Sequence, residues 1–445
     1  MSRLVAYAIL RSGSTTPLRD VERFSDEAEL DARDRGLVRR ILGTEVRRRT
    51  TLRAVIHAIA PAIKNAEMLA HLHIALAQAL FLDRIPPHAV LAECSDAVRQ
   101  TLGPAKVRIA REFLNSLYDR LENARSGDPR RDLVGRNLSF REPVFRDPVE
   151  HPLLWAEDAL SMPAPMLKRW IARHGEAKAR ALAELALDEA PLSMRVVAGE
   201  RAELANELRA LGVETRDGVH ERVLLAPSAT AEAVTSCAAF TEGRLTIQGE
   251  HALRAAEALQ ARAGEELVDL CAAPGGKTAV LAASGARVIA CDSNESRLER
   301  LRSTVQRLGV EERVEVLATD AGEALGTRTF DGVLVDAPCS NTGVLAQRPE
   351  ARWRFGPASR AELAAIQTRL IDRAAELVRP GGRLVWSTCS IEPEENRRTV
   401  DAFLTRHAGW TLEEERESLP DTDTTQERGA GPIDGGYFAR LRRAP

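Results

Sequence analysis

The chain has 445 residues, which is enough for about three domains of ordinary size, each with a sizeable core. Its 62 lysines and arginines nearly balance 65 acidic residues, so the net charge of −3 excludes a protein that binds polyanions over its whole surface. The six cysteines include no Cys-x-x-Cys pair and have no matching histidine cluster, which favours a reducing compartment over a disulfide or zinc framework. No apolar run is long enough to span a bilayer. We therefore expect a cytoplasmic protein without metal.

Residues 1–125 are predicted to form a small all-helical domain. Apolar residues recur three and four positions apart in the stretches 4–10, 37–42, 66–82 and 107–121. The same region contains a basic cluster made of Arg33, Arg35, Arg39, Arg40, Arg47, Arg48, Arg49 and Arg53. Such a cluster is typical of helices that contact RNA phosphates, and a solvated helix face has the same composition.

The composition changes in the next two segments. Residues 126–165 contain six prolines without a clear period, which predicts a linker or extended arm. Residues 166–250 begin with a helical pattern at 166–187, followed by a strand-like stretch at 193–197 and a helix at 202–211. We therefore expect a small α+β domain over 166–250.

Residues 251–445 are predicted to form the domain that carries the chemistry. The run Leu267–Leu270 is mostly apolar, and Gly275 and Gly276 end it just before a helical pattern at 277–283, which predicts a buried strand, a tight turn and a helix. Glycines at such a turn let a ligand approach the backbone, and exposed amides at the helix start favour a negative group. The pattern indicates a nucleotide-type site, although an ordinary strand-to-helix turn has the same signature.

Further strands alternate with helical segments such as 294–308 and lie at 286–291, 314–318, 332–335 and 383–386. This alternation predicts a parallel, doubly wound α/β sheet. Asp292, Asp320, Asp336 and Cys389 follow successive strands, so they should meet at the carboxyl edge, where ligands bind. Asp292 lies about twenty residues past the glycines, where an acidic side chain can take both hydroxyls of a ribose.

The carboxyl end completes the sheet. Residues 436–443 are predicted to form its closing strand, and an acidic, threonine-rich loop at 413–426 is expected before it.

Three stretches of this region, 269–278, 336–343 and 387–396, resemble the motifs of S-adenosylmethionine-dependent RNA cytosine-C5 methyltransferases. The chain as a whole is similar to the bacterial 16S ribosomal RNA methyltransferase B (RsmB) family, with a NusB-like helical domain at its amino end. The resemblance implies a Rossmann-like class I methyltransferase domain that acts as a monomer on RNA, with 16S ribosomal RNA as the leading substrate. No membrane and no metal are implied.

S-adenosylmethionine is the cofactor that the resemblance implies. Its binding residues are expected at the first turn and after the following strands: Cys271, Ala272, Ala273, Pro274, Gly275, Gly276, Lys277, Asp292, Arg297, Asp320 and Asp336. Asp320 is expected near the adenine. Lys277 is expected near both the donor and the target base, and Asp336 is expected to hydrogen-bond the edge of the cytosine.

Methylation at C5 of cytosine requires a cysteine, because C5 is a poor nucleophile until a thiolate adds at C6. A base must then remove the C5 proton, and an acid near N3 must stabilise charge on the ring. Residue chemistry alone does not rank Cys339 against Cys389, since the Pro338-Cys339 pair also resembles the nucleophile loop of DNA cytosine methyltransferases. The resemblance to RNA enzymes with both motifs assigns Cys389 as the nucleophile and Cys339 to product release. Residues 393–395 are predicted to be an ordinary helix start without a catalytic role.

One departure from the family pattern bears on the substrate. Where the family commonly carries Arg-Arg-His/Asn-Pro, this chain has Ala346-Gln347-Arg348-Pro349, so two expected arginines are missing. Arg348, Arg352 and Arg354 could compensate for them. Two other functions stay open at this point: an RNA-binding assembly or antitermination factor that retains the fold, and the same methylation on transfer RNA.

Overall fold

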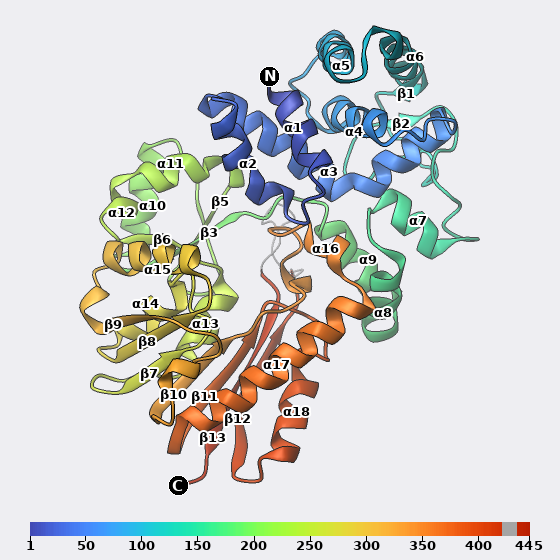
Figure 1. Cartoon of the computed structure of the whole chain (residues 1–445). Coiled ribbons are helices and arrows are strands. Elements are labelled where there is room, and N and C mark those ends of the chain that lie inside the picture. The colour runs from blue at the N-terminus through green and yellow to red at the C-terminus, as the bar shows by residue number, and fades with distance from the viewer. Residues whose placement is uncertain (421–433) are drawn as a thin grey trace. The chain divides into compact units, whose positions relative to one another are not determined.

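The computed structural model describes residues 1–420 and 434–445 (Figure 1). The chain divides into two compact units: residues 1–187 together with 349–354, and residues 188–348 together with 355–445. Within the described ranges, no helix is both long and apolar enough to cross a membrane.

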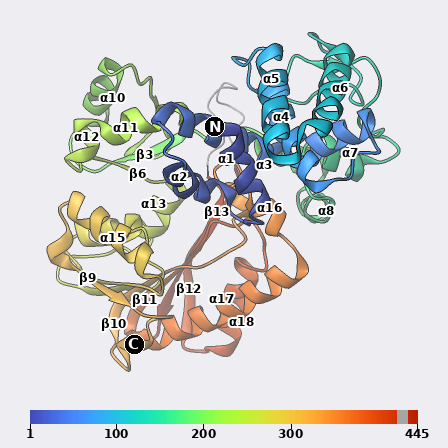
Figure 2. The ribbon, with the colours of Figure 1, turned by 45° about the horizontal axis from the view of Figure 1, so that its top comes forward.

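The first unit begins with consecutive helices, as predicted for residues 1–125. They are α1 (Ser2–Arg11), α2 (Pro17–Glu27), α3 (Ala32–Ile59), α4 (Ala66–Phe81), α5 (Pro87–Leu102) and α6 (Pro104–Arg120). Asp31 caps α3 by accepting a hydrogen bond from the Asp34 amide, and Asn65 caps α4 in the same way. Val5, Ile9 and Val21 are buried with residues of α3 in one apolar core, while α4, α5 and α6 lie side by side (Figure 2).

The segment 126–165, predicted as a linker, contains regular structure. Strand β1 (Leu121–Glu122) pairs with β2 (Ser139–Phe140), and α7 (Pro152–Ala159) follows. The buried Asp132 carboxylate accepts hydrogen bonds from the backbone of Ser126 at 2.7 Å and Gly127 at 3.1 Å. Buried polar contacts of this kind leave no apolar period in the sequence. Helices α8 (Ala164–His174) and α9 (Glu176–Leu185), which we grouped with the α+β region, belong to the first unit.

The second unit opens with a small antiparallel sheet in the order β4-β5-β3-β6. Its elements are β3 (Leu192–Val196), α10 (Arg201–Ala210), β4 (Arg216–Asp217), β5 (Val223–Ala226), η1 (Ser228–Thr230), α11 (Ala231–Ser236), α12 (Ala238–Thr241) and β6 (Leu245–Ile247). Met194, Leu204 and Leu224 belong to its separate apolar core. The α+β character predicted for this stretch is therefore present.

The predicted parallel α/β sheet is confirmed, and the described residues contribute seven strands to it in the order β12-β13-β11-β10-β7-β8-β9. Its strands are β7 (Glu266–Asp269), β8 (Arg287–Asp292), β9 (Val314–Ala318), β10 (Phe330–Asp336), β11 (Val378–Thr388), β12 (Trp410–Ser418) and β13 (Gly436–Arg443). Strands β7 to β11 run parallel, and β13 is antiparallel to both β11 and β12. The connecting elements are α13 (Glu250–Glu257), α14 (Gly276–Ala283), α15 (Glu295–Arg307), η2 (Glu311–Arg313), η3 (Glu323–Leu325), η4 (Thr342–Val344), α16 (Ala351–Arg354), α17 (Pro357–Leu377) and α18 (Arg397–Arg406).

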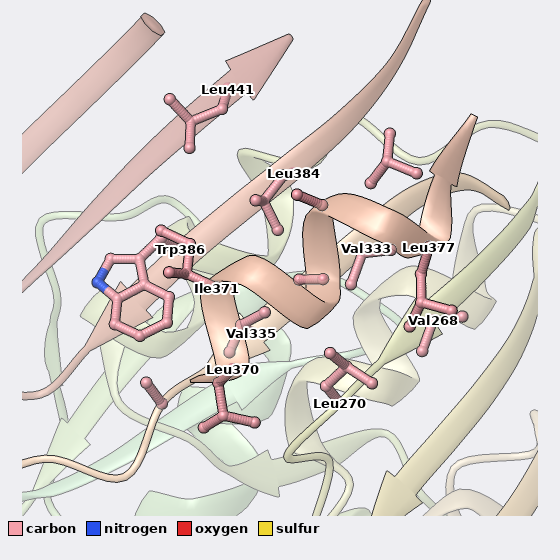
Figure 3. Close-up of a cluster of buried hydrophobic side chains, with 14 of the residues drawn as sticks. Val268, Leu270, Val333, Val335, Leu370, Ile371, Leu377, Leu384, Trp386 and Leu441 are labelled. Carbon is pink, nitrogen blue, oxygen red and sulfur yellow. The ribbon is translucent and has the colours of Figure 1, made fainter. Parts of the chain in front are cut away.

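Helices cover both faces of this sheet because successive strand residues point to opposite sides. Val333 and Val335 pack with Leu370 and Ile371 of α17 on one face (Figure 3). Leu334 lies in the other core, with residues of α13, α14 and α15. The two apolar layers fix the strands, so the side chains just beyond their carboxyl ends are held at one edge.

The prediction of a loop at 413–426 is wrong for residues 413–418 and is not tested beyond residue 420. Residues 413–418 form the second half of β12, while 421–426 lie outside the described residues. Glu413 pairs with Arg440 and Arg442 of β13 at 3.0 and 2.8 Å, so the acidic residues of 413–418 belong to an edge strand.

Candidate active site

The turn between β7 and α14 forms one side of the site. Gly275 adopts a left-handed conformation with φ 100°, and a side chain there would lie 3.2 Å from Leu301. The glycine therefore allows both the turn and its close packing. Asp269 ends β7 and accepts a hydrogen bond from Thr278 Oγ1 at 2.8 Å, and burial raises the pKa of its carboxyl to about 7. Asp269 thus joins the strand end to the start of the helix.

Asp292, at the end of β8, has the chemistry expected of a ribose-binding residue. Its side chain is buried, and Oδ1 accepts a hydrogen bond from the Asn294 amide at 3.0 Å. No residue in 1–420 or 434–445 donates a hydrogen bond to Oδ2, although Arg297 Nη2 lies 3.4 Å from it. Arg297 also donates to the carbonyl of Ala273 at 3.3 Å, so it connects Asp292 to the glycine turn. A buried acceptor at the end of a parallel strand fits a nucleoside-type cofactor.

Asp320 follows β9 at the same edge but already has a cationic partner. Arg369 of α17 donates to both of its oxygens, at 2.8 and 3.2 Å, and both side chains are about half exposed. A role for Asp320 near an adenine would therefore include Arg369, which sequence reasoning did not identify.

Lys277 and Asp336 form the charged centre of the site. Lys277 Nζ, on α14, donates to Asp336 Oδ2, at the end of β10, at 2.7 Å. Burial lowers the pKa of Lys277, but the adjacent carboxylate outweighs this, so the pKa lies above its ordinary value. Lys277 is therefore held as a cation beside a carboxylate that remains 36% exposed.

Cys339 and Cys389 lie against each other, with their sulfurs 3.1 Å apart. Cys389 follows β11, and Cys339 lies in the loop after the neighbouring strand β10. The hydrogen bond between the thiols lowers the pKa of Cys389 and raises that of Cys339, and burial opposes the first shift and adds to the second. The pair therefore favours a thiolate on Cys389 and a neutral thiol on Cys339.

Glu395 holds the Cys339 loop and corrects the prediction of an ordinary helix start at 393–395. Helix α18 begins at Arg397, and the buried Glu395 carboxylate accepts a hydrogen bond from the Ser340 amide at 2.8 Å. Gln367 of α17 donates to Glu395 at 3.3 Å and to the Pro338 carbonyl at 2.9 Å. Membership of the third motif was the only sequence signal for Glu395, and Gln367 gave none.

The arginines expected to replace the missing pair have different environments. Arg352 is wholly buried in the first unit, where it donates to the carbonyls of Ser161 and Ala186, so it is not available to RNA. Arg348 is exposed in the second unit and donates to Asn341 Oδ1 at 2.7 Å. The expectation of compensation is therefore wrong for Arg352 and stays open for Arg348 and for Arg354, which is also exposed.

The basic cluster of α3 is not one continuous face. Arg48 is 6% exposed, lies over the Phe81 ring and donates to the Val134 carbonyl at 2.9 Å. Arg49 makes two hydrogen bonds of 2.9 Å to the buried Glu45. Other members of the cluster are exposed and form no ion pair with a carboxylate of the described chain, namely Arg33, Arg40 and Arg53.

Comparison with known families gives two matches. Residues 256–439 match the model of the family described as 16S rRNA methyltransferase RsmB/F. Residues 3–117 match the model of the NusB family.

Full-length relatives give the same assignment. The chain is 33% identical over 380 residues to ribosomal RNA small subunit methyltransferase B of Serratia proteamaculans, covering 81% of this chain and 79% of the relative. It is 29% identical over 375 residues to the protein of the same name from Shewanella oneidensis, covering 82% and 80%.

Solved structures share the fold. The crystal structure of PH0851 covers 99% of this chain and 98% of its own, with a TM-score of 0.76 and 24% identity. The structure of NSun6 from Pyrococcus horikoshii with SFG covers 64% of this chain and 98% of its own, with a TM-score of 0.55 and 20% identity.

Proposed function

The chain belongs to the ribosomal RNA small subunit methyltransferase B family, and from this we propose that it methylates C5 of a cytosine in 16S ribosomal RNA. One observation carries the choice of C5: two thiols 3.1 Å apart lie at the same sheet edge as the Lys277–Asp336 pair. Methylation of an oxygen or an exocyclic nitrogen needs no thiolate, because those atoms have lone pairs of their own. C5 becomes nucleophilic only after a thiolate adds at C6.

S-adenosylmethionine is the methyl donor, and when bound it supplies an electrophilic methyl group. In our proposal residues 271–277 and Asp292 hold it, with Arg297 supporting both through its contacts to Asp292 and Ala273. The Asp292 Oδ2 atom, which has no hydrogen-bond donor among the described residues, is suited to accept from the ribose hydroxyls. Asp320 is proposed to lie near the adenine together with Arg369.

Cys389 is the proposed nucleophile. Its sulfur bonds to C6, and the electron pair of the C5–C6 double bond moves into the ring and makes C5 able to take the methyl group. Asp336 accepts a hydrogen bond from the exocyclic amino group of the cytosine. The Lys277 ammonium orients that carboxylate and supplies positive charge as negative charge develops on the ring.

Cys339 is assigned to product release. After methyl transfer C5 carries both the methyl group and its original hydrogen. A base removes that proton, the C5–C6 double bond forms again and the bond from C6 to the Cys389 sulfur breaks. Because Cys339 stays a neutral thiol within hydrogen-bond distance of this sulfur, it can donate to the departing thiolate and stabilise it.

The target cytosine must leave its stack to reach either thiol, which suits a loop or a locally opened helix better than a continuous duplex. Bisulfite sequencing of total RNA from a strain of the source organism that lacks the gene tests this function. We expect one 5-methylcytosine to disappear from 16S ribosomal RNA and to return with the wild-type gene but not with Cys389→Ser. A site lost from transfer RNA instead would reject the substrate, and an unchanged pattern would reject the reaction.

A further inference from the structure

Asn341 connects the loops that carry the two thiols. It has left-handed backbone angles, φ 60° and ψ 24°, which asparagine tolerates better than most side chains. Its Nδ2 donates to the Cys339 carbonyl at 2.7 Å, and its Oδ1 accepts from Cys389 Sγ at 3.2 Å. One amide therefore holds the backbone of the first cysteine and touches the sulfur of the second.

Arg348 brings a positive charge to the same amide. Its Nη1 donates to Asn341 Oδ1 at 2.7 Å, so this oxygen lies between the guanidinium and the Cys389 sulfur. Arg348 forms no ion pair with a carboxylate in 1–420 or 434–445, and its charge is not neutralised by contact. It lies shortly after η4, which ends at Val344, in the segment where this chain departs from the family pattern.

The other charges around Cys389 partly cancel. Lys277 and Asp336 form an ion pair, so the cation and the anion act on the sulfur in opposite directions. His251 of α13 contacts the Thr388 carbonyl at 3.1 Å and stays neutral near pH 7, because burial lowers its pKa to about 4. Asp434, which accepts a hydrogen bond from Gln347, also faces Arg348, and although burial raises the pKa of its carboxyl to about 6, it offsets part of the guanidinium charge at pH 7. Of the two cations that act on Cys389, Lys277 and Arg348, only Lys277 forms an ion pair with a carboxylate of the described residues.

We propose that Asn341 and Arg348 act as one positioning unit, in which the amide fixes the guanidinium close to Cys389 and thereby favours the reactive thiolate. This inference rests on the proposed role of Cys389 and assigns a role to Asn341, which lies in the second motif, and to Arg348, which lies outside all three. After the thiol loses its proton, Asn341 Oδ1 no longer receives a hydrogen bond from sulfur but keeps the one from Arg348. The bare amide oxygen disfavours the thiolate, and the positive charge of the guanidinium bound to that oxygen offsets this repulsion.

The test is the rate at which iodoacetamide alkylates Cys389 as a function of pH, in the full chain without RNA or donor. Cys339 and Cys389 fall in different tryptic peptides, so mass spectrometry follows each one separately. Arg348→Gln should slow alkylation of Cys389 by about 3- to 10-fold below the midpoint and shift the midpoint to higher pH. Arg313→Gln, an exposed arginine at the opposite edge of the sheet, is the matched control and should leave the rate unchanged.

A double-mutant cycle tests whether the two residues act together. Asn341→Gly removes the side chain and accepts the positive φ without strain. In that background Arg348→Gln should change the rate by less than about twofold, because the guanidinium is no longer held near the sulfur. The proposal would be overturned if Arg348→Gln gave the same dependence of the Cys389 alkylation rate on pH as the control variant. It would also be overturned if Arg348→Gln slowed alkylation as much in the Asn341→Gly background as in the wild type. Alkylation does not depend on methyl transfer, so these outcomes are distinct from failure of the proposed function.

Discussion

The arginine-rich helix α3 and the carboxyl edge of the seven-stranded sheet both attract attention in the sequence, but they use their charges differently. In α3, Arg48 donates to a backbone carbonyl and lies over an aromatic ring, and Arg49 donates to the buried Glu45. At the sheet edge, Asp292 keeps one oxygen without a hydrogen-bond donor from the described residues, and Cys389 lies within reach of a second thiol. Charge density in a sequence thus says little about function, whereas position at a strand end says much.

Glu45 explains why Arg49, one member of the basic cluster of α3, is structural. It is buried, and it receives two hydrogen bonds from Arg49 and one from His73 at 3.0 Å. Burial alone would raise the pKa of this carboxyl, but these partners lower it to about 2. The charged form is therefore the one that the fold requires.

The largest effect should come from the sheet edge. Asp336→Asn removes the carboxylate that holds Lys277 and faces the proposed base, so we expect kcat for methyl transfer to fall on the order of 10²- to 10⁴-fold. Lys277, which is 13% exposed, loses its counter-charge in this variant, so the melting temperature should fall as well, and kcat is measured at a temperature at which the variant is folded. Asp401→Asn, which removes an exposed carboxylate on α18, is the control. If the two variants had equal activity, Asp336 would have no part in methyl transfer.

The second effect is on stability and belongs to α3. Glu45→Gln leaves Arg49 partly buried without its counter-charge, so the free energy of unfolding of the first unit should fall by about 3 to 5 kcal/mol in urea titrations. Donor binding in the second unit should not change. The exposed pair at Glu27 and Arg23 provides the comparison, and Glu27→Gln should cost at most about 0.5 kcal/mol.

The role of Glu45 also predicts the direction in which the stability of the fold changes with pH. A carboxyl whose pKa is lower in the folded than in the unfolded chain contributes stability above its unfolded value of about 4.3 and loses it as the pH falls toward 2. Glu45→Gln should therefore flatten the loss of stability over that acid range. An equally steep curve in the variant would mean that Glu45 is not the group responsible.

The sequence was most informative where residues with reactive or charged side chains follow directly after a predicted strand. The strand predicted at 314–318 matches β9, and Cys389, expected at the carboxyl edge, lies there against Cys339. Arg352 and Glu395 could not be placed, because their roles depend on partners such as Ala186 and Ser340, which lie far away in the sequence. The spacing of apolar residues in a sequence reveals the periodic pattern of a single helix or strand. A buried polar contact between residues far apart in the sequence produces no such pattern.

A smaller effect is expected on donor binding. Asp292→Ala removes the open acceptor, and calorimetry should show S-adenosylmethionine binding weakened at least tenfold, since hydrogen bonds to a charged group contribute about 1.5 to 3 kcal/mol. Glu299→Ala, an exposed carboxylate on the neighbouring helix α15, should bind the donor as the wild type does. Unchanged affinity in Asp292→Ala would remove this residue from the cofactor site.

The smallest effect separates the exposed arginines of α3 from the buried ones. Neutralising Arg33, Arg40 and Arg53 should lower the slope of log K against log salt for RNA binding by up to about 0.7 to 0.9 for each phosphate that the protein no longer neutralises. The sequence alone would direct the same test to Arg47, Arg48 and Arg49, but there the hydrogen bonds of Arg48 and Arg49 within the fold would make reduced stability the main result. An unaltered slope in the exposed set would mean a solvated helix face.

The central claim is that Cys389 attacks the base and Cys339 releases it, and a denaturing gel of each variant with unmodified ribosomal RNA and donor tests it most directly. Cys389→Ala cannot form the bond to C6, so it should give no covalent protein–RNA adduct. Cys339→Ala can still attack and transfer the methyl group but lacks the thiol that stabilises the departing sulfur, so a denaturant-resistant adduct should accumulate. An adduct in Cys389→Ala and none in Cys339→Ala would contradict the account and reverse the two roles.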